Sequence, residues 1–201
     1  MALLLAAVLA CGPEDLPTRM SQAEARDGGA FVRARGGIWA GGGFAFETIR
    51  TDSTQVKLED EVLPSAGVDA GLIFADRFVL FGSADAAWAK DVEVQAVGAA
   101  LGYRERRAVG APAGVPDEVT IYAGGLWGSF QVDAAGFGDF DDALGFRAGL
   151  LLTWLPGRGM ALSAVGEYRL LEFDYEEEVF DGDTHAGGST VWLGAAFDLR
   201  F

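Results

Sequence analysis

The first residues to test for chemistry are the only histidine, His185, and the serines that could pair with it. A histidine beside a serine can act as the general base for a nucleophilic hydroxyl. Ser189 follows His185 by four residues and Ser163 lies in an earlier apolar segment, but the spacing around them is not typical of a hydrolase. We therefore assign no catalytic residue and expect no enzymatic activity.

Two glycine-rich runs, Gly36-Gly37 and Gly41-Gly42-Gly43, are the candidates for a phosphate cradle. A phosphate-binding loop opens a helix, whose N-terminal N–H groups hold the anion. Both runs lie inside a segment that we expect to be a strand. We therefore expect no cofactor.

Carboxylates gather in three segments, and such oxygen-rich clusters can bind Ca²⁺ or Mg²⁺. Their spacing matches no EF-hand loop, so we assign no metal site. We expect a solvated, self-repelling surface, with divalent cations at these acidic loops as the alternative. The clusters are Glu59-Asp60-Glu61, Asp139 with Asp141 and Asp142, and Glu176-Glu177-Glu178 with Asp181 and Asp183.

Residues 1–11, MALLLAAVLAC, form an apolar run that is too short to span a membrane as a helix and is typical of a signal peptide. Cys11, the only cysteine, follows Val8-Leu9-Ala10, which resembles a bacterial lipobox. Two interpretations stay open: a lipidated Cys11, or an ordinary signal region that contains a cysteine. Neither allows a disulfide within the chain. The polar residues 12–28 predict a flexible periplasmic tether.

The composition excludes some classes of protein. The net charge of -15, from 15 basic and 30 acidic residues, argues against nucleic acid as a partner, because phosphate binding requires a basic face. The chain has 201 residues, half of them apolar, which is enough for one domain. Its 29 glycines show no Gly-X-Y period, so a collagen-like chain is excluded as well.

Apolar alternation dominates the chain after residue 29. In the last segment, 191–201, one face is wholly apolar and the other carries Asp198 and Arg200. Successive side chains of a strand point to opposite faces, so this pattern predicts a strand. The segments of this kind are about 36–48, 64–74, 78–89, 94–104, 119–132, 143–154, 160–173 and 191–201.

The strand lengths and their connections predict an all-β, antiparallel, up-and-down transmembrane β-barrel of about eight strands over residues 29–201. Tight turns are expected at 75–77 and 155–159. Longer connections are expected at 48–63, 133–142 and 172–188, as on the external side of such barrels. The register of the fourth and fifth strands stays open, because both faces of 119–132 are largely apolar.

Seven charged residues fall on the inward face of these predicted strands. An eight-stranded barrel is filled by side chains or holds one small ligand, and charges inside it must be paired. We predict a plug of salt bridges; a gated ion path or a binding site is the alternative. The seven residues are Asp69, Asp85, Arg147, Glu167, Arg169, Asp198 and Arg200.

Aromatic residues near the strand ends are expected to lie at the headgroup level of a membrane, where their apolar rings and polar edges are both satisfied. Aromatic packing in the core of a soluble barrel is the alternative. The expected periplasmic set is Trp39, Phe78, Tyr103, Trp154 and Phe201, and the expected outer set is Trp88 and Trp127.

The alternating C-terminal strand that ends on Phe201 resembles the β-signal of outer-membrane barrels, with Phe197, Leu199 and Phe201 as the matching residues. The strand number and turn asymmetry are similar to those of small outer-membrane barrels such as the OmpA transmembrane domain and OmpX. This resemblance implies an outer-membrane location, contact with outer-membrane lipid and lipopolysaccharide, and insertion by the barrel-assembly machinery through the C-terminal strand. It implies a structural or surface-interaction role and no catalysis, since the histidine-serine motif of outer-membrane lipid A enzymes is absent from the sequence.

A second interpretation is a soluble, lipocalin-like barrel that is tethered as a lipoprotein through Cys11 and binds a small hydrophobic ligand. The two interpretations differ in the direction of the apolar faces. Alternation alone does not say which face of a strand meets water. The side of the sheet that carries the charges decides between them.

Overall fold

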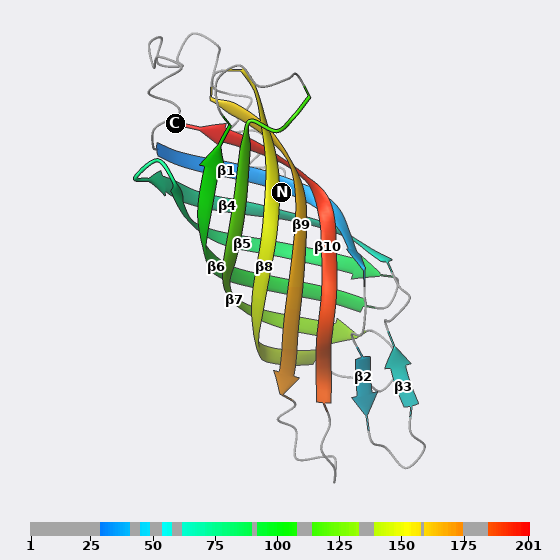
Figure 1. Ribbon diagram of the computed structural model, residues 1–201. Helices are drawn as coiled ribbons and strands as arrows, with labels where there is room; N and C mark the ends of the chain where they lie inside the picture. Colours follow the sequence, from blue (N-terminus) through cyan, green and yellow to red (C-terminus); the bar gives the residue numbers. More distant parts are fainter. Residues whose placement is uncertain are drawn as a thin grey trace, which may run out of the picture.

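Antiparallel strands make up most of the described part of the protein, whose structure is a computed structural model (Figure 1). The structure describes residues 29–40, 45–48, 54–57, 62–89, 92–107, 114–132, 139–157, 159–174 and 185–201. The strands are β1 Gly29–Ala40, β2 Ala45–Thr48, β3 Thr54–Lys57, β4 Val62–Phe74, β5 Phe78–Ala89, β6 Val92–Arg106, β7 Glu118–Val132, β8 Asp139–Gly157, β9 Met160–Asp174 and β10 His185–Arg200.

Eight of these strands form a closed barrel. They are hydrogen-bonded in the order β1-β4-β5-β6-β7-β8-β9-β10, and β10 pairs back onto β1, with Phe31 opposite Arg200 and Ala40 opposite Val191. Each strand of the wall lies beside the next one along the chain, so the barrel is antiparallel and up-and-down. The predicted fold class is confirmed.

The two short strands continue the wall beyond one rim. β2 pairs with β10 through Phe46 and Ala186, and β3 pairs with β2 (Figure 1). We call this rim the loop end, and the opposite rim, which holds the turn 75–77 and Phe201, the turn end. β2 and β3 thus belong to the connection between β1 and β4, which extends beyond the loop end.

Alternation decides which side chains enter the barrel. Along β10, Trp192 and Asp198 are buried inside, whereas Leu193 and Phe197 are exposed on the outer surface. The same order holds in β7, where Tyr122 points inward, so the register left open by the sequence has Ile121 and Trp127 on the outside. The outer face of the wall is apolar, and the inner face carries both apolar and charged side chains.

The prediction of a first strand near 36–48 is wrong in its position. β1 begins at Gly29 and ends at Ala40, and residues 41–44 lie outside the described residues. The start of β1 is difficult to recognise in the sequence because Arg33 and Arg35 interrupt its apolar residues, and charges are not expected in a barrel wall. Both occupy inward positions, where the alternation of β1 allows them.

The connections follow the expected asymmetry in part. The tight turn 75–77 is confirmed, with Ala75 (φ 47°) and Asp76 (φ 58°) in the left-handed region and Arg77 N donating to the Ala75 carbonyl at 2.7 Å. The expected loops 133–142 and 172–188 are shorter, because β8 begins at Asp139 and β10 at His185. Polar residues at the strand ends had concealed these extra pairs from a search for apolar alternation.

The prediction for Trp39 is also wrong. β1 runs toward the loop end, and Trp39 is buried inside the barrel there, at 3% exposure, instead of lying at the outer surface of the turn end. The shift of the first strand is the reason. The rings of Phe78, Tyr103 and Phe201 do lie exposed near the turn end, and Trp88 is exposed toward the loop end.

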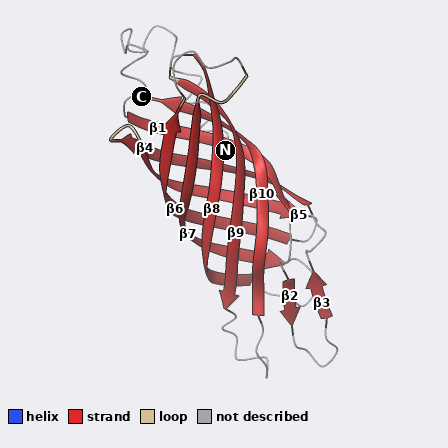
Figure 2. Ribbon diagram, in the orientation of Figure 1, coloured by secondary structure: helices blue, strands red, loops and turns tan. Residues whose placement is uncertain are grey.

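Strands and connecting loops account for the described chain (Figure 2). Within the described residues, no helix is long and apolar enough to cross a membrane.

Candidate functional site

The charged lumen is the candidate site, and the structure places all seven predicted residues in it. Asp69, Asp85, Arg147, Glu167, Arg169 and Asp198 are buried, and the side chain of Arg200 is 8% exposed. They come from five strands of the wall, β4, β5, β8, β9 and β10. Long-range closure of the barrel brings them together.

Arg33 and Asp198 form the best-shaped ion pair of the lumen. Arg33 Nε donates to Asp198 Oδ1 at 2.7 Å and its Nη2 donates to Oδ2 at 3.0 Å, a two-pronged contact across the β1–β10 seam. Such a bidentate arrangement fixes geometry as well as charge. Arg33 Nη1 also donates to Asp69 Oδ2 at 3.3 Å. These bonds link β1 to β4 and β10.

A second group surrounds Asp85 and Glu167. Arg35 Nη2 donates to Asp85 Oδ2 at 2.6 Å and lies 3.5 Å from Glu167 through its Nη1. Arg169 donates to both carboxylates, Nη1 to Asp85 and Nε to Glu167. Tyr122 Oη donates to Glu167 Oε2 at 2.6 Å. Each carboxylate therefore serves more than one donor.

A third group lies toward the turn end, around the buried Glu118. Its Oε1 is 3.1 Å from Arg104 Nη1 and 3.4 Å from Arg106 Nε, and its Oε2 is 2.8 Å from Arg200 Nη1. Arg200 Nη2 is in turn 3.6 Å from Asp198 Oδ2. One carboxylate thus contacts three arginines, and Arg200 joins this group to the rest of the lumen.

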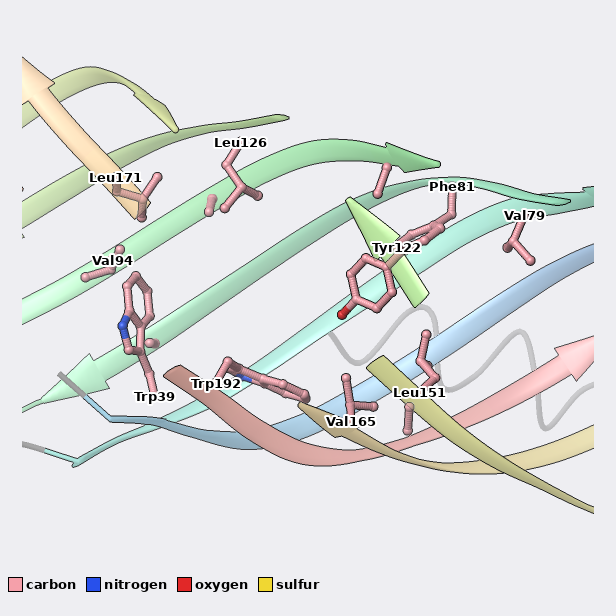
Figure 3. Close-up of a cluster of buried hydrophobic side chains, with 14 of the residues drawn as sticks. Trp39, Val79, Phe81, Val94, Tyr122, Leu126, Leu151, Val165, Leu171 and Trp192 are labelled. Carbon is pink, nitrogen blue, oxygen red and sulfur yellow. The ribbon is translucent and has the colours of Figure 1, made fainter. Parts of the chain in front are cut away.

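Aromatic rings also line the lumen, and Figure 3 shows Trp39, Phe81, Tyr122 and Trp192 among the other buried apolar side chains. Phe81 and Tyr122 meet edge to face with centroids 5.2 Å apart. Guanidinium groups lie over such rings, Arg35 at 5.4 Å from Trp192 and Arg169 at 5.4 Å from Trp39. This stacking stabilises a cation where water is scarce.

Two glycines lack the Cβ atom that would otherwise clash with these rings. A Cβ at Gly149 would lie 2.4 Å from Tyr122 Cζ, and one at Gly37 would lie 2.9 Å from Trp192 Cζ2. Gly149 is the cross-strand partner of Tyr122. The ring therefore lies flat against the backbone of β8, which leaves room for the arginines in a narrow barrel.

Sequence reasoning missed several residues of the lumen. Arg33 and Arg35 lay outside the expected first strand, and Arg104 and Glu118 lay at or beyond the ends of the expected fourth and fifth strands. Tyr122 was hidden by the unresolved register of β7. Parity with Trp39 along GAFVRARGGIWA could have found the first two, since positions 31, 33, 35, 37 and 39 share a face.

The structure does not bring the histidine and serines together. The backbone of His185 pairs with Asp174 at the loop end, whereas Ser163 pairs with Ala196, eleven residues along β10. Ser189 is on the same strand as His185 and four residues away, about 13 Å at the usual rise of a strand. Ser163 instead shares a 2.8 Å hydrogen bond with Thr153.

Other predicted features lie at the ends of the chain. Phe197 and Phe201 are exposed on the outer surface and Leu199 is half-buried, and Phe201 N donates to the Ala30 carbonyl at 2.9 Å. Cys11 and the clusters 59–61 and 176–183 lie outside the described residues, while Asp139, Asp141 and Asp142 lie within β8. The described residues hold no group of three or more side chains suited to a metal ion.

Comparison with known proteins gives structural matches only. Neither a protein-family model nor a curated protein sequence matches the chain. The crystal structure of Neisserial surface protein A (NspA) matches with a TM-score of 0.53 at 14% identity, over 86% of this chain and 97% of that one. The outer-membrane protein AlkL matches with a TM-score of 0.51 at 12% identity, over 94% of this chain and 98% of its own.

The fold is that of a small outer-membrane β-barrel. The match to these barrels spans nearly their whole length, so no large part of them is missing here. The identity is too low to carry over any activity. The barrel fold encloses the inward charges within a wall whose outer surface is apolar.

Proposed function

We propose that the chain is an integral outer-membrane protein with a structural or surface-interaction role. The observation that carries this proposal is the direction of the apolar faces. Leu72, Leu101 and Ile121 are 53–59% exposed on the outer surface, while charges lie inside. A lipid bilayer stabilises such an outer band, whereas water would leave large apolar patches exposed.

The same observation argues against the soluble, ligand-binding barrel. A lipocalin-like barrel requires an apolar interior to hold a hydrophobic ligand. The centre of this lumen instead carries Arg35, Arg147, Arg169 and Glu167, each 6% exposed or less. A hydrophobic ligand bound there would exclude water from these charges and would offer them no hydrogen bonds in return.

Extraction and gel mobility test the proposal. The protein should stay with the membrane pellet in alkaline carbonate and high salt, and should be released only by detergent. Unboiled samples should migrate differently from boiled ones, because closed barrels resist unfolding in dodecyl sulfate at room temperature. Release by carbonate without detergent would refute the integral-barrel proposal.

We further propose that the paired charges close the lumen. The contacts of Asp85 with Arg169 and of Glu167 with Arg35 support this, since each joins two strands that are not neighbours in the wall, β5 with β9 and β9 with β1. The barrel reconstituted in a planar bilayer should show no steady conductance. Ohmic, long-lived openings in the wild-type protein would support the gated ion path in place of the plug.

The turn end is then periplasmic and the loop end external. On the external side the acidic segments 59–61, 139–142 and 176–183 would face lipopolysaccharide, and divalent cations are the partners that their charge favours. Calorimetric titration with Ca²⁺ tests this interaction. An absence of heat at millimolar Ca²⁺ would leave the loops as a solvated surface only.

Lipidation of Cys11 is proposed as a second attachment to the membrane. Its position behind an apolar run supports it. Metabolic labelling with a radioactive fatty acid should mark the wild-type protein and not the Cys11→Ser variant. Equal absence of label in both would identify 1–11 as an ordinary signal region.

A further inference from the structure

Arg147 differs from the other arginines of the lumen because its guanidinium lacks hydrogen-bond partners. The side chain is 0% exposed, yet among the described residues none of Nε, Nη1 and Nη2 has an acceptor. Its shortest ion-pair contact is 3.8 Å, from Nη1 to Glu167 Oε2. A buried charged donor left in this way is strongly unfavourable.

The carboxylates of the lumen are already occupied. Both oxygens of every one contact another arginine or Tyr122, at 3.3 Å or less. Glu167 Oε2, the oxygen nearest to Arg147, accepts from Tyr122 at 2.6 Å and also faces Arg35 at 3.5 Å. The five carboxylates are Asp69, Asp85, Glu118, Glu167 and Asp198.

Two aromatic rings and two cross-strand neighbours lie around Arg147. Its guanidinium carbon lies 5.0 Å from the centroid of Phe81 and 6.0 Å from that of Tyr122. Such rings stabilise the cation but are not ordinary hydrogen-bond acceptors for its N–H groups. The cross-strand neighbours are Gly124 in β7, which has no side chain, and Arg169 in β9, whose guanidinium donates and accepts nothing.

The charge of Arg147 is also the least compensated in the centre of the lumen. Among the described residues there, Arg33, Arg35 and Arg169 each have a carboxylate oxygen within 2.7 Å, whereas the shortest such contact of Arg147 is 3.8 Å. Arginine does not lose its proton in proteins, so this positive charge stays.

We propose that the lumen binds a small inorganic anion, such as chloride, at the in-plane edge of the Arg147 guanidinium. The anion accepts hydrogen bonds from the N–H groups that the described chain leaves unsatisfied and compensates the charge of Arg147. A bound water would accept hydrogen bonds but would leave that charge uncompensated. The inference concerns what the lumen holds and is independent of whether the barrel interacts at the cell surface.

Bromide is the probe that locates the anion. The full chain, folded in detergent, is crystallised with sodium bromide, and an anomalous difference map is calculated. We expect a bromide peak within hydrogen-bond distance of Arg147 Nε, Nη1 or Nη2. A map with no peak there, and with ordinary water density at the guanidinium edge, would overturn the proposal.

Stability measurements give a second readout. At constant ionic strength, replacing gluconate by chloride should raise the urea midpoint of the wild-type barrel in proportion to the logarithm of chloride. Arg147→Met should lose this dependence. Arg200→Met also removes one lumenal arginine but leaves Arg147, so it should keep the dependence; loss in both variants would assign the effect to overall charge and contradict a site at Arg147.

If Arg147→Met does not fold, the bromide map of the wild-type protein still decides. The outcomes are separable from those of the proposed function. Carbonate extraction and gel mobility report on membrane integration, and neither depends on the anion.

Discussion

Arg169 shows how the lumen holds a charge away from water. Its guanidinium donates to Asp85 and Glu167 and lies over the Trp39 ring, so two strands and one aromatic side chain of a third position it. The contacts with both carboxylates compensate for the desolvation of all three groups. Removal of one member of such a group leaves the others buried with less compensation.

We therefore predict that Arg169→Met lowers the free energy of unfolding by about 3–5 kcal/mol. Reversible urea unfolding in detergent or lipid, followed by tryptophan fluorescence, measures it. The control is Arg77→Met, which removes an exposed hydrogen bond to Tyr103 and a pair with Glu105 in which both side chains are about 60% exposed. It should not change the midpoint, because solvent screens that pair. Equal effects of the two variants would contradict a structural role for the lumenal pairs.

Gly149 provides a prediction about space instead of charge. Gly149→Ala would place a methyl group 2.4 Å from Tyr122 Cζ and Oη, so the ring must move and its 2.6 Å bond to Glu167 must lengthen or break. We expect a loss of about 1–3 kcal/mol, the usual effect of overpacking a core. Urea midpoints measure the loss.

Gly166→Ala is the matched control for that substitution. Gly166 is on the outer face of β9, and a Cβ there would meet Leu193 Cδ2 at an ordinary 3.6 Å. The midpoint should stay within experimental error. A variant at Gly149 that behaves like this control would show that Tyr122 does not need the glycine.

The lumenal residues could be predicted where apolar alternation was regular and not elsewhere. Asp198 and Arg200 interrupt one face of a strand whose other face is wholly apolar, so their direction follows from parity. Arg33 and Arg35 occur in a strand whose small outer residues give a weak signal. Which carboxylate meets which arginine depends on the pairing of distant strands, such as β1 with β10, and parity within one strand contains no information about it.

At the scale of the elements, the strands were predictable in their apolar middle and less so at their ends. β5 runs from Phe78 to Ala89, as expected, because both ends adjoin a turn. β8 continues back to Asp139 and β10 to His185 through polar residues. Backbone pairing continues beyond the apolar band, where side chains face water and alternation in hydropathy is lost.

β10 is the element for which we predict a role in assembly. Phe197, Leu199 and Phe201 share its outer face, and Phe201 is 57% exposed at the end of the strand. We predict that Phe201→Ala, or deletion of Phe201, reduces the folded protein in the outer membrane severalfold, because the proposed assembly signal loses its terminal ring. Heat-modifiable protein in membrane fractions gives the measurement.

Phe74→Ala is the control for this prediction. Phe74 ends β4 near the same rim, at 45% exposure, so it tests the general loss of an exposed ring there. Its membrane level should match that of the wild-type protein. Normal membrane levels of the Phe201 variants would refute the proposed assembly signal. Equal losses in the Phe201 and Phe74 variants would also contradict it, because any exposed aromatic ring at this rim would then have the same effect.

At the scale of the whole molecule, the distribution of charge and apolar surface implies where the bilayer lies. Ala99 is on the outer face at the middle of β6, and it pairs with Gly82 and Gly125 at the same height. Gln95 is on the same face of the same strand, four residues nearer the loop end. The two positions therefore share a strand and a face and differ in depth, and Gln95 also donates to Glu93 at 3.0 Å.

We predict that Ala99→Arg lowers the free energy of unfolding by about 2–4 kcal/mol in phospholipid vesicles, since arginine at the midplane must leave water. Gln95→Arg should cost about 0–1 kcal/mol, because its guanidinium reaches the headgroups. Urea titration of the vesicle-bound barrels compares them. A soluble barrel would carry both arginines in water and tolerate them equally, so equal midpoints would contradict the membrane orientation inferred from the outer apolar band.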